Sequence, residues 1–349
     1  MDVAARIVTL RLAETFRIAR EARDEVDVVH VELRHEGTSG FGEAAPSERY
    51  GESAPSALAF VEAAEEALGQ DPFALEEIRD RLGERPAEHA AKAALDAALH
   101  DLCGKLLRLP AWRLLGLRRA APPTSWTISL GDPDEMARKA ERVGGEFRRL
   151  KLKLGGRDGL DLERVGAVAA VTDIPLQVDA NEDWTLDEAF DALPQLAALG
   201  VEYCEQPLAA GAPGGPELKR GSPLPIYVDE DCHTLADVAR CAEIAHGVNI
   251  KLAKAGGIRE AISIVHAARA LGLGVMLGCM IESGLGIAAA CQLASLCDHV
   301  DLDGNLLLAD DPWPGVEFVD GVQLPAHSPG LGVRRVGLGD ERVTVRERA

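Results

Sequence analysis

The sequence predicts an α/β protein in which a small α+β domain precedes an eight-stranded parallel (β/α) barrel. The first observation is a change of pattern within residues 1–116, from a period of two, typical of strands, to a period of three to four, typical of helices. The second is a series of eight short β-rich runs beyond residue 123, which recur about every 25 residues. The chain of 349 residues is long enough for both parts.

Residues 1–118 are expected to form the first domain. Residues 5–13 and 27–37 alternate apolar and polar side chains, and a turn rich in glycine follows the second run, which predicts strands of a sheet. Residues 53–116 are rich in Ala, Leu, Glu and Arg and carry an apolar residue every three to four positions, which predicts helices.

The eight runs that follow are predicted to be barrel strands. They occupy residues 124–130, 148–154, 175–180, 201–206, 225–230, 247–252, 274–280 and 299–304. A strand, a crossover helix and two short loops use about this spacing, so the strands should be parallel, and eight repeats predict a closed barrel over residues 119–309. Residues 310–349 do not continue the pattern and are expected to return to the first domain as an irregular tail.

Composition and charge exclude several classes of protein. The 57 acidic residues outnumber the 37 Lys and Arg residues and give a net charge of −20, so no nucleic acid partner is expected, since phosphate binding requires a basic face. No apolar run approaches the length that crosses a bilayer, and the first residues do not resemble a leader. The seven cysteines form no C-x-x-C pair and are expected to be reduced. We therefore expect a soluble cytoplasmic protein without a membrane partner.

A glycine-rich segment offers a competing interpretation. Residues 284–289 loosely fit a dinucleotide-binding fingerprint, with Asp303 at a suitable distance beyond them. Such a fingerprint belongs in the first βα unit of a doubly wound sheet, whereas this segment follows the seventh predicted strand. We therefore interpret it as a tight turn packed against the sheet.

Charged residues stand at the ends of most predicted barrel strands, where the active site of such a barrel lies. Asp179, Glu205 and Asp229 end three consecutive strands. Carboxylates brought so close repel one another unless a cation is present, and a set of oxygen ligands suits Mg²⁺. A single acidic strand end is more often a helix cap, but three in succession favour a metal site.

Three lysines accompany these carboxylates. Lys151 and Lys153 share one face of the second strand, and leucines take the other, which should face the helix layer. Lys251, four strands further round, would lie opposite them across the barrel mouth. Two ammonium groups that face each other over a bound dication lower one another's pKa, which a lysine base needs near neutral pH.

Carbanion chemistry explains what this arrangement can do. A proton α to a carboxylate is very weakly acidic, and its removal requires positive charge at the carboxylate oxygens. Mg²⁺ and Lys151 would supply that charge, while Lys153 and Lys251 would take and return protons from opposite faces. The expected outcome is inversion of a stereocentre.

The strand ends K-x-K, D-x-N, E-Q-P, D-E and N-I-K occur in this order, and at these residues the chain resembles the dipeptide epimerases of the muconate-lactonising subgroup of the enolase superfamily. The likeness extends over nearly the whole chain. It includes residues 16–20, 42–43, 49–53, 94–101, 178–182, 205–207, 249–252, 256–257, 277–280 and 301–304.

The resemblance implies a modified TIM barrel, (β/α)7β, with an N-terminal α+β enolase-type capping domain that the C-terminal tail completes. Two capping loops, residues 14–25 and 43–53, would close over the substrate. The metal ligands of one Mg²⁺ per subunit would be Asp179, Glu205 and Asp229. The acid/base pair would be Lys153 and Lys251, and a homo-oligomer is expected because relatives form symmetric oligomers.

The resemblance also implies how a dipeptide binds. Asp301 and Asp303 correspond to a D-x-D pair that holds the α-ammonium, and Arg20 corresponds to an arginine that receives a glutamate side chain. The implied reaction is 1,1-proton transfer at the C-terminal residue of L-Ala-D/L-Glu, as in peptidoglycan (murein peptide) recycling. The expected substrate-binding residues are Arg20, Thr127, Lys151, Cys279, Ile281, Asp301 and Asp303.

Two departures from the family pattern bear on specificity and on the metal. Glu21 follows Arg20 where relatives often have Gly, so it could pair with Arg20 or favour a cationic substrate side chain. Asp231 stands where many relatives have Ser and could change metal affinity.

Several alternatives remain open at this point. An epimerase for dipeptides with cationic or hydrophobic side chains, an N-acylamino acid racemase or an o-succinylbenzoate synthase would use the same lysines. The D-x-D pair disfavours an N-acyl substrate, which carries no ammonium. A Schiff-base aldolase built on Lys251 and a non-catalytic scaffold are the other two hypotheses.

Overall fold

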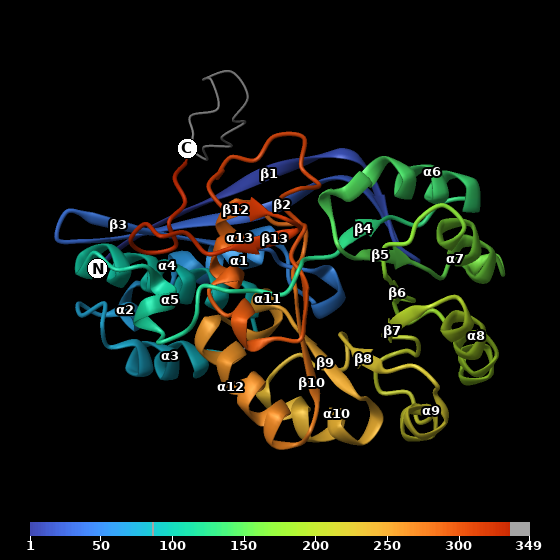
Figure 1. Cartoon of the computed structure of the whole chain (residues 1–349). Helices are drawn as coiled ribbons and strands as arrows, with labels where there is room; N and C mark the ends of the chain where they lie inside the picture. The colour runs from blue at the N-terminus through green and yellow to red at the C-terminus, as the bar shows by residue number, and fades with distance from the viewer. Residues whose placement is uncertain (86, 336–349) are drawn as a thin grey trace.

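The first domain is an antiparallel sheet covered on one face by helices. The computed structural model describes residues 1–85 and 87–335. The strands β1 (Asp2–Arg17), β2 (Ala22–His35) and β3 (Thr38–Ala44) pair in that order (Figure 1, blue). The helices are η1 (Glu48–Tyr50), α1 (Ala54–Glu62), α2 (Glu65–Leu68), α3 (Leu75–Gly83), α4 (His89–Leu107) and α5 (Ala111–Leu114).

Helix α4 is buried along most of its length because it lies between the sheet and the barrel. An α-helix that is apolar all round needs partners on every side, and α4 packs on β3 on one side and on α11 (Leu252–Ala255) of the barrel on another. The approach to β3 depends on glycine: a Cβ atom on Gly42 would lie 2.0 Å from the carbonyl oxygen of Ala94.

We expect Gly42→Ala to lower the free energy of unfolding by about 3 kcal/mol or more, since the added methyl group can be accommodated only by moving α4 away from β3. The matched control is Gly166→Ala in α7 (Asp161–Ala169), where a Cβ atom meets nothing within 4 Å. That change should stabilise by about 0.5–1 kcal/mol, because alanine loses less backbone entropy in a helix. Urea unfolding of both variants checks the prediction, and equal stability of the two would contradict it.

The second part of the chain is an eight-stranded parallel barrel, as the spacing of the β-rich runs predicts. Neighbouring strands in the sheet are consecutive in sequence, and every pair is parallel. An isolated parallel bridge between Thr124 and Val300 joins the first strand region to the last. The strands are β4 (Trp126–Ile128), β5 (Leu150–Lys153), β6 (Leu176–Asp179), β7 (Val201–Glu205), β8 (Ile226–Val228), β9 (Gly247–Ile250), β10 (Gly274–Gly278) and β11 (His299–Asp301).

Helices surround the strands on the outside (Figure 1). On β5, the side chains of Leu150 and Leu152 are fully buried in a core that also contains residues of α6 and α7, so Lys151 and Lys153 point into the barrel. The helices after α5 are α6 (Pro133–Val143), η2 (Gly144–Glu146), α7, α8 (Leu186–Ala198), α9 (Gly215–Gly221), η3 (Leu235–Asp237), α10 (Val238–Ile244), α11, α12 (Ile258–Ala270), α13 (Gly284–Cys291) and η4 (Ala294–Leu296).

The described part of the tail takes the place of a helix after β11. It contains the hairpin β12 (Glu317–Val319) and β13 (Val322–Leu324). Its backbone bonds to the first domain, because Ala111 N–H donates to the carbonyl of Gly330 (2.8 Å) and Leu331 N–H donates to the carboxylate of Asp101 (2.8 Å). Residues 336–349 of the predicted tail lie outside the described residues, and the division into 1–118, 119–309 and 310–349 stays a prediction.

The first domain and the barrel also contact each other close to β9, the strand that Lys251 follows. Lys251 directly follows β9 and precedes α11, which packs on α4. The carboxylate of Asp96 in α4 accepts a hydrogen bond from Ile258 N–H (2.7 Å) at the start of α12. Gly257 has φ of 133°, and a Cβ atom there would lie 2.6 Å from that of Asp96. The first domain thus caps a barrel helix.

The glycine-rich segment 284–289 forms the start of α13, and each of its residues is buried. A Cβ atom on Gly284 would lie 2.1 Å from the carbonyl oxygen of Trp313, so this glycine permits close packing against the chain, as a tight turn requires. Among the described residues, no helix combines the length and the apolar character needed to cross a membrane.

Candidate active site

A cavity of about 140 Å³ lies at the C-terminal end of the barrel strands, beneath two loops of the first domain. Side chains from both parts of the chain line it, and they include every predicted substrate-binding residue. The lining residues that bear on the chemistry are Arg20, Arg49, Thr127, Lys151, Lys153, Asn181, Asp229, Glu230, Lys251, Cys279, Ile281, Asp301 and Asp303.

Lys151 is held among three carboxylates in the centre of the barrel. Its Nζ lies 2.7 Å from Asp301 Oδ2, 2.8 Å from Glu205 Oε2 and 3.4 Å from Asp179 Oδ2. Burial alone would lower the pKa of Lys151, but these carboxylates raise it well above its ordinary value. These ion pairs favour the protonated form of Lys151, which is suited to stabilising negative charge.

Lys153 and Lys251 each pair with a different carboxylate, and they extend from β5 and from the end of β9, four strands apart in the barrel. Lys153 Nζ lies 2.7 Å from Asp179 Oδ2, and Lys251 Nζ lies 2.8 Å from Asp229 Oδ2. Burial lowers the pKa of Lys251, but Asp229 outweighs it and raises the pKa above the ordinary value. Lys151 contributes a lowering of this pKa, as facing ammonium groups should, but without a dication between them the carboxylates of Asp229 and Glu205 outweigh it.

The three predicted metal ligands are close enough for their charges to shift one another's pKa, but each of them forms an ion pair with at least one lysine. Burial raises the pKa of Glu205, Lys151 opposes this, and Asp179 and Asp229 add to the rise. In the described ranges, no three acidic, histidine or cysteine side chains gather closely enough to form a ready-made metal site. The ligand assignment stays a prediction.

The donor chemistry nevertheless fits a hard divalent cation. Asn181 Oδ1, beside Asp179, and Glu230 Oε2, beside Asp229, are buried acceptors without a hydrogen-bond partner among the described residues. Oxygen atoms that have no N–H partner suit Mg²⁺, which prefers oxygen ligands. A bound Mg²⁺ would take the place of Lys153 at Asp179 and of Lys251 at Asp229. Asp179, Glu205 and Asp229 would hold such an ion.

The backbone beyond β6 and β7 is strained where these side chains leave the strands. Asn181, Glu182 and Gln206 are not glycines, yet their φ angles are 48°, 70° and 35°. Such left-handed conformations cost about 1–2 kcal/mol each and persist where the surrounding structure enforces them, often at functional sites.

Sequence reasoning assigned no role to Lys254, which the structure buries beneath Asp229. Its Nζ donates to Asp229 Oδ1 and to the backbone carbonyls of Cys232 (2.8 Å) and Asn249 (3.1 Å). One oxygen of Asp229 thus faces Lys254 and the other faces Lys251. Lys254 lies in the four-residue helix α11, which follows β9. The direction of the Lys254 side chain depends on how this helix packs, which the sequence pattern does not give.

Asp301 and Asp303 occupy the predicted ammonium site but differ in their contacts. Asp301 Oδ2 is taken by Lys151, whereas Asp301 Oδ1 is buried without a hydrogen-bond partner in the described structure. Asp303 Oδ2 accepts from Thr127 N–H (2.6 Å). Burial, followed by the charge of Asp301, raises the pKa of Asp303 to about 7. A cation placed between the two would relieve this repulsion.

Arg20 enters the cavity from the β1–β2 loop and is already paired. Its guanidinium donates to the backbone carbonyl of Asn181 (2.9 Å), to Glu182 (3.1 Å) and to Glu230 (3.0 Å). Arg49 binds both oxygens of Glu182 at 2.8 Å. Sequence reasoning did not assign these partners, although Glu230 directly follows the strand end Asp229 and Glu182 lies three residues beyond Asp179.

The two departures noted in the sequence have structural outcomes. Glu21 pairs with Arg23 at 2.6 Å, so the suggestion that it pairs with Arg20 is wrong. Asp231 lies 2.5 Å from the guanidinium of Arg240 and accepts from Gln206 (2.9 Å). The charge of Asp231 is therefore balanced by Arg240, and Gln206 links Asp231 to the backbone N–H of Asp229.

Comparison with known proteins gives matches over both parts of the chain. Residues 2–116 match the mandelate racemase / muconate lactonizing enzyme N-terminal domain, and residues 135–335 match the enolase C-terminal domain-like family. The L-Ala-D/L-Glu epimerase of Bacteroides thetaiotaomicron is 39% identical over 94% of this chain and 86% of its own length. The hydrophobic dipeptide epimerase of a Flavobacteria bacterium is 38% identical over 93% of this chain and 95% of its own.

A solved structure agrees with these matches. The dipeptide epimerase from Enterococcus faecalis, complexed with Mg and the dipeptide L-Leu-L-Tyr, superimposes with a TM-score of 0.90. It is 33% identical and covers 95% of this chain and 98% of that chain.

Proposed function

The chain belongs to the mandelate racemase and muconate lactonizing enzyme family of the enolase superfamily and is an isomerase of the racemase and epimerase class, and from this premise we propose that it is a Mg²⁺-dependent dipeptide epimerase. The observation that carries the proposal is the pair Lys153 and Lys251. They extend from β5 and β9, four strands apart in an eight-stranded barrel, into one cavity. A planar enolate between them would meet a proton donor on each face.

The reaction begins with a dipeptide whose α-ammonium lies at Asp301 and Asp303, with its C-terminal carboxylate near Lys151. Bound Mg²⁺ would supply additional positive charge at that carboxylate. One lysine, neutral in this step, takes the α-proton, and the electron pair moves into the carboxylate to form an enolate. Protonated Lys151 would stabilise the developing negative charge on the carboxylate. The lysine on the other face returns a proton to the α-carbon, which inverts the stereocentre.

For the substrate we propose L-Ala-D/L-Glu, with a role in the recycling of peptidoglycan peptides in the cytoplasm. The support is Arg20 in the cavity wall and the 39% identity to an L-Ala-D/L-Glu epimerase. One observation favours a second candidate, an epimerase for dipeptides whose second side chain is not acidic. Glu182 and Glu230 already pair with Arg20, so a substrate carboxylate would have to displace one of them.

The proposal is tested by α-proton exchange in D₂O with Mg²⁺, followed by mass spectrometry over a library of L-Xaa-L-Xaa dipeptides. We expect deuterium at the C-terminal residue together with its epimerised product. Exchange confined to Ala-Glu would support the recycling assignment, and exchange centred on other second residues would replace the substrate but keep the reaction. Absence of exchange from every dipeptide would refute the function.

A further inference from the structure

Two loops of the first domain cover the catalytic cavity, and we call them the first capping loop (residues 14–25) and the second capping loop (residues 43–53). Both contribute side chains to the cavity wall, among them Arg20 from the first loop and Tyr50 from the second. The first connects β1 to β2, and the second connects β3 to α1. Substrate enters and product leaves past the loops that cover a site, so the contacts that hold them bear on the reaction.

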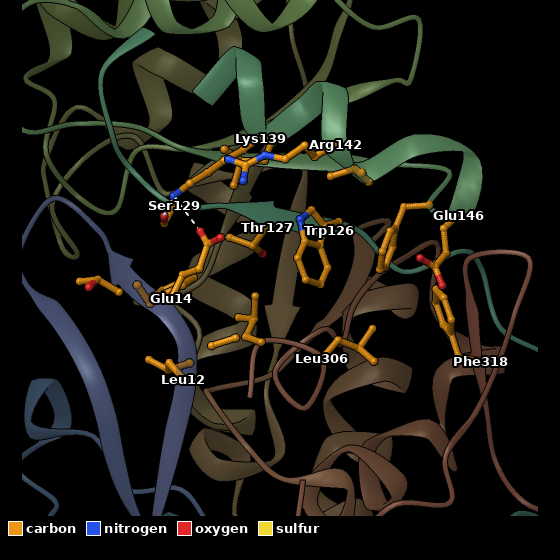
Figure 2. A pocket seen from close by; sticks show the side chains of 17 residues that line it. Leu12, Glu14, Trp126, Thr127, Ser129, Lys139, Arg142, Glu146, Leu306 and Phe318 are labelled. Atoms are coloured by element: carbon orange, nitrogen blue, oxygen red, sulfur yellow. Dashed lines mark hydrogen bonds and ion pairs between the residues drawn. The ribbon is translucent and has the colours of Figure 1, made fainter. Parts of the chain in front are cut away.

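The base of the first capping loop is held by the backbone of the barrel. Leu130 N–H, just beyond β4, donates to the carbonyl of Arg17 (2.9 Å). An ion pair between Glu14 and Lys139 of α6 (3.5 Å) adds to this connection. Figure 2 shows the ion pair among the side chains that line a cavity between β1 and β4.

The tip of the first capping loop, residues 18–21, is held differently. Its backbone hydrogen bond stays within the loop, and none of the described barrel residues shares a backbone hydrogen bond with it. Its polar connection to the barrel is the side chain of Arg20, whose guanidinium donates to Glu182 (3.1 Å) and to Glu230 (3.0 Å). The tip is therefore fastened by charge, whereas the base is fastened by the backbone.

The second capping loop is fastened to one of the same carboxylates. Arg49 in η1 donates two hydrogen bonds to Glu182, one to each carboxylate oxygen, both at 2.8 Å. Such a two-point contact fixes the guanidinium and the carboxylate relative to one another. Tyr50, the next residue, stacks on His233 of the barrel with ring centroids 4.6 Å apart. Glu182 is thus the polar contact that the two capping loops share.

The barrel itself fixes the position of Glu182. The N–H of Glu182 donates to the carbonyl of Gln206 (2.8 Å), and its Oε1 accepts from Ala210 N–H (2.9 Å), so two residues beyond β7 hold it. Its φ angle of 70° lies in the left-handed region, which residues other than glycine rarely adopt unless their surroundings enforce it. The side chain of Glu182 does not line the catalytic cavity. Glu182 therefore contacts the loops rather than the substrate.

We propose that Glu182 is a positioning residue that fastens both capping loops to the barrel, so that the two loops close and open together over the catalytic cavity. The inference rests on the proposed function, because it takes this cavity to be the one in which a dipeptide reacts. The side chains of Arg20 and Arg49 are 35% and 41% exposed. Ion pairs of such partly exposed groups are weak individually, so the closed arrangement can be released when product leaves.

The test is Glu182→Gln, which removes the charge and keeps the size of the side chain. Hydrogen–deuterium exchange of backbone amides, measured by mass spectrometry of peptides, should become about threefold faster or more in both capping loops and stay unchanged in the barrel strands. Mg²⁺ affinity, measured by calorimetric titration, should also stay unchanged, because Glu182 is not an expected metal ligand.

Kinetics of the same variant separate loop closure from chemistry. The substrate is the fastest L-Ala-L-Xaa dipeptide whose second side chain is uncharged, since an acidic side chain could itself bind to the freed Arg20. KM should rise about fivefold or more while kcat changes less than about twofold, because loss of a contact that serves substrate and transition state equally raises KM alone.

Glu14→Gln is the matched control. It also removes an ion pair between the first capping loop and the barrel, but at the base, where the backbone hydrogen bonds remain. Amide exchange in both capping loops, KM and kcat should equal those of the wild-type protein.

Several results would overturn the inference. Faster exchange in only one capping loop, or in neither, would exclude a shared anchor. Faster exchange throughout the barrel strands would assign Glu182 to the fold rather than to the loops, and weaker Mg²⁺ binding or a kcat that falls as much as kcat/KM would assign it to the chemistry. The amide exchange needs no substrate, so the two proposals can fail separately: if both loops loosen but no dipeptide is epimerised, the function fails and the shared anchor stands.

Discussion

Replacing Lys251 by Met should reduce epimerisation by about 10³-fold or more, because general acid–base groups commonly contribute 10²–10⁴-fold. Methionine is of similar length and apolar, so it fills the same space without a proton to give. The same loss is expected for Lys153→Met, since inversion requires both faces of the enolate. Conversion of each pure dipeptide isomer into the other, followed by chiral chromatography, measures the effect.

The two lysine variants should differ in which isomer they still exchange. A protein that lacks one base can remove and replace the α-proton from the remaining face, so one isomer should exchange deuterium with retention. Lys153→Met and Lys251→Met should retain opposite isomers. Lys219→Met is the control. Lys219 is half-buried on α9, and its ammonium donates to the backbone carbonyl of Ala242. The epimerase activity of this variant should equal that of the wild-type protein. Loss of exchange from both isomers in both variants would argue against a two-base reaction.

Removal of divalent cations should abolish α-proton exchange, with a loss of about 10³-fold or more, since a bound dication stabilises the enolate charge by several kcal/mol. Added Mg²⁺ should restore it. Glu205→Gln should weaken Mg²⁺ binding at least tenfold, because it removes one of three expected anionic ligands. Calorimetric titration with Mg²⁺ measures this independently of activity.

Glu202→Gln is the matched control for the metal experiment. Glu202 lies on the same strand as Glu205 but is half-exposed and pairs with Arg149. Its replacement should leave both Mg²⁺ affinity and exchange unchanged. Full exchange in the presence of excess chelator would contradict the metal requirement and would favour a Schiff-base reaction at Lys251.

The barrel could be predicted from the sequence because two local signals coincide on each strand. On β5, leucines alternate with lysines, and since helices cover the outside of a barrel, the lysines had to point inward. The same logic brought Asp179, Glu205 and Asp229 to one end of consecutive strands. These inferences need only the period of a strand and the order of the sheet.

What could not be predicted depends on contacts between segments far apart in the chain. The partners of Arg20 are Glu182 and Glu230, which lie beyond two different barrel strands and meet only when the β1–β2 loop folds over them. Lys254 is one turn beyond Lys251, and its direction is set by the packing of α11 on α4.

The hydrogen bond from Ile258 N–H to Asp96 makes the capping domain and the barrel mutually dependent. Gly257 allows the two segments to approach there because any side chain at this position would meet Asp96. The segment that carries Lys251 is therefore held in place by the first domain. The loops that determine specificity and the residues that transfer protons cannot be exchanged independently of one another. A chimera that carries a relative's first domain would need an acidic residue at the position of Asp96. Without that residue, the barrel of the hybrid would fold, but the segment that carries Lys251 would be less firmly positioned.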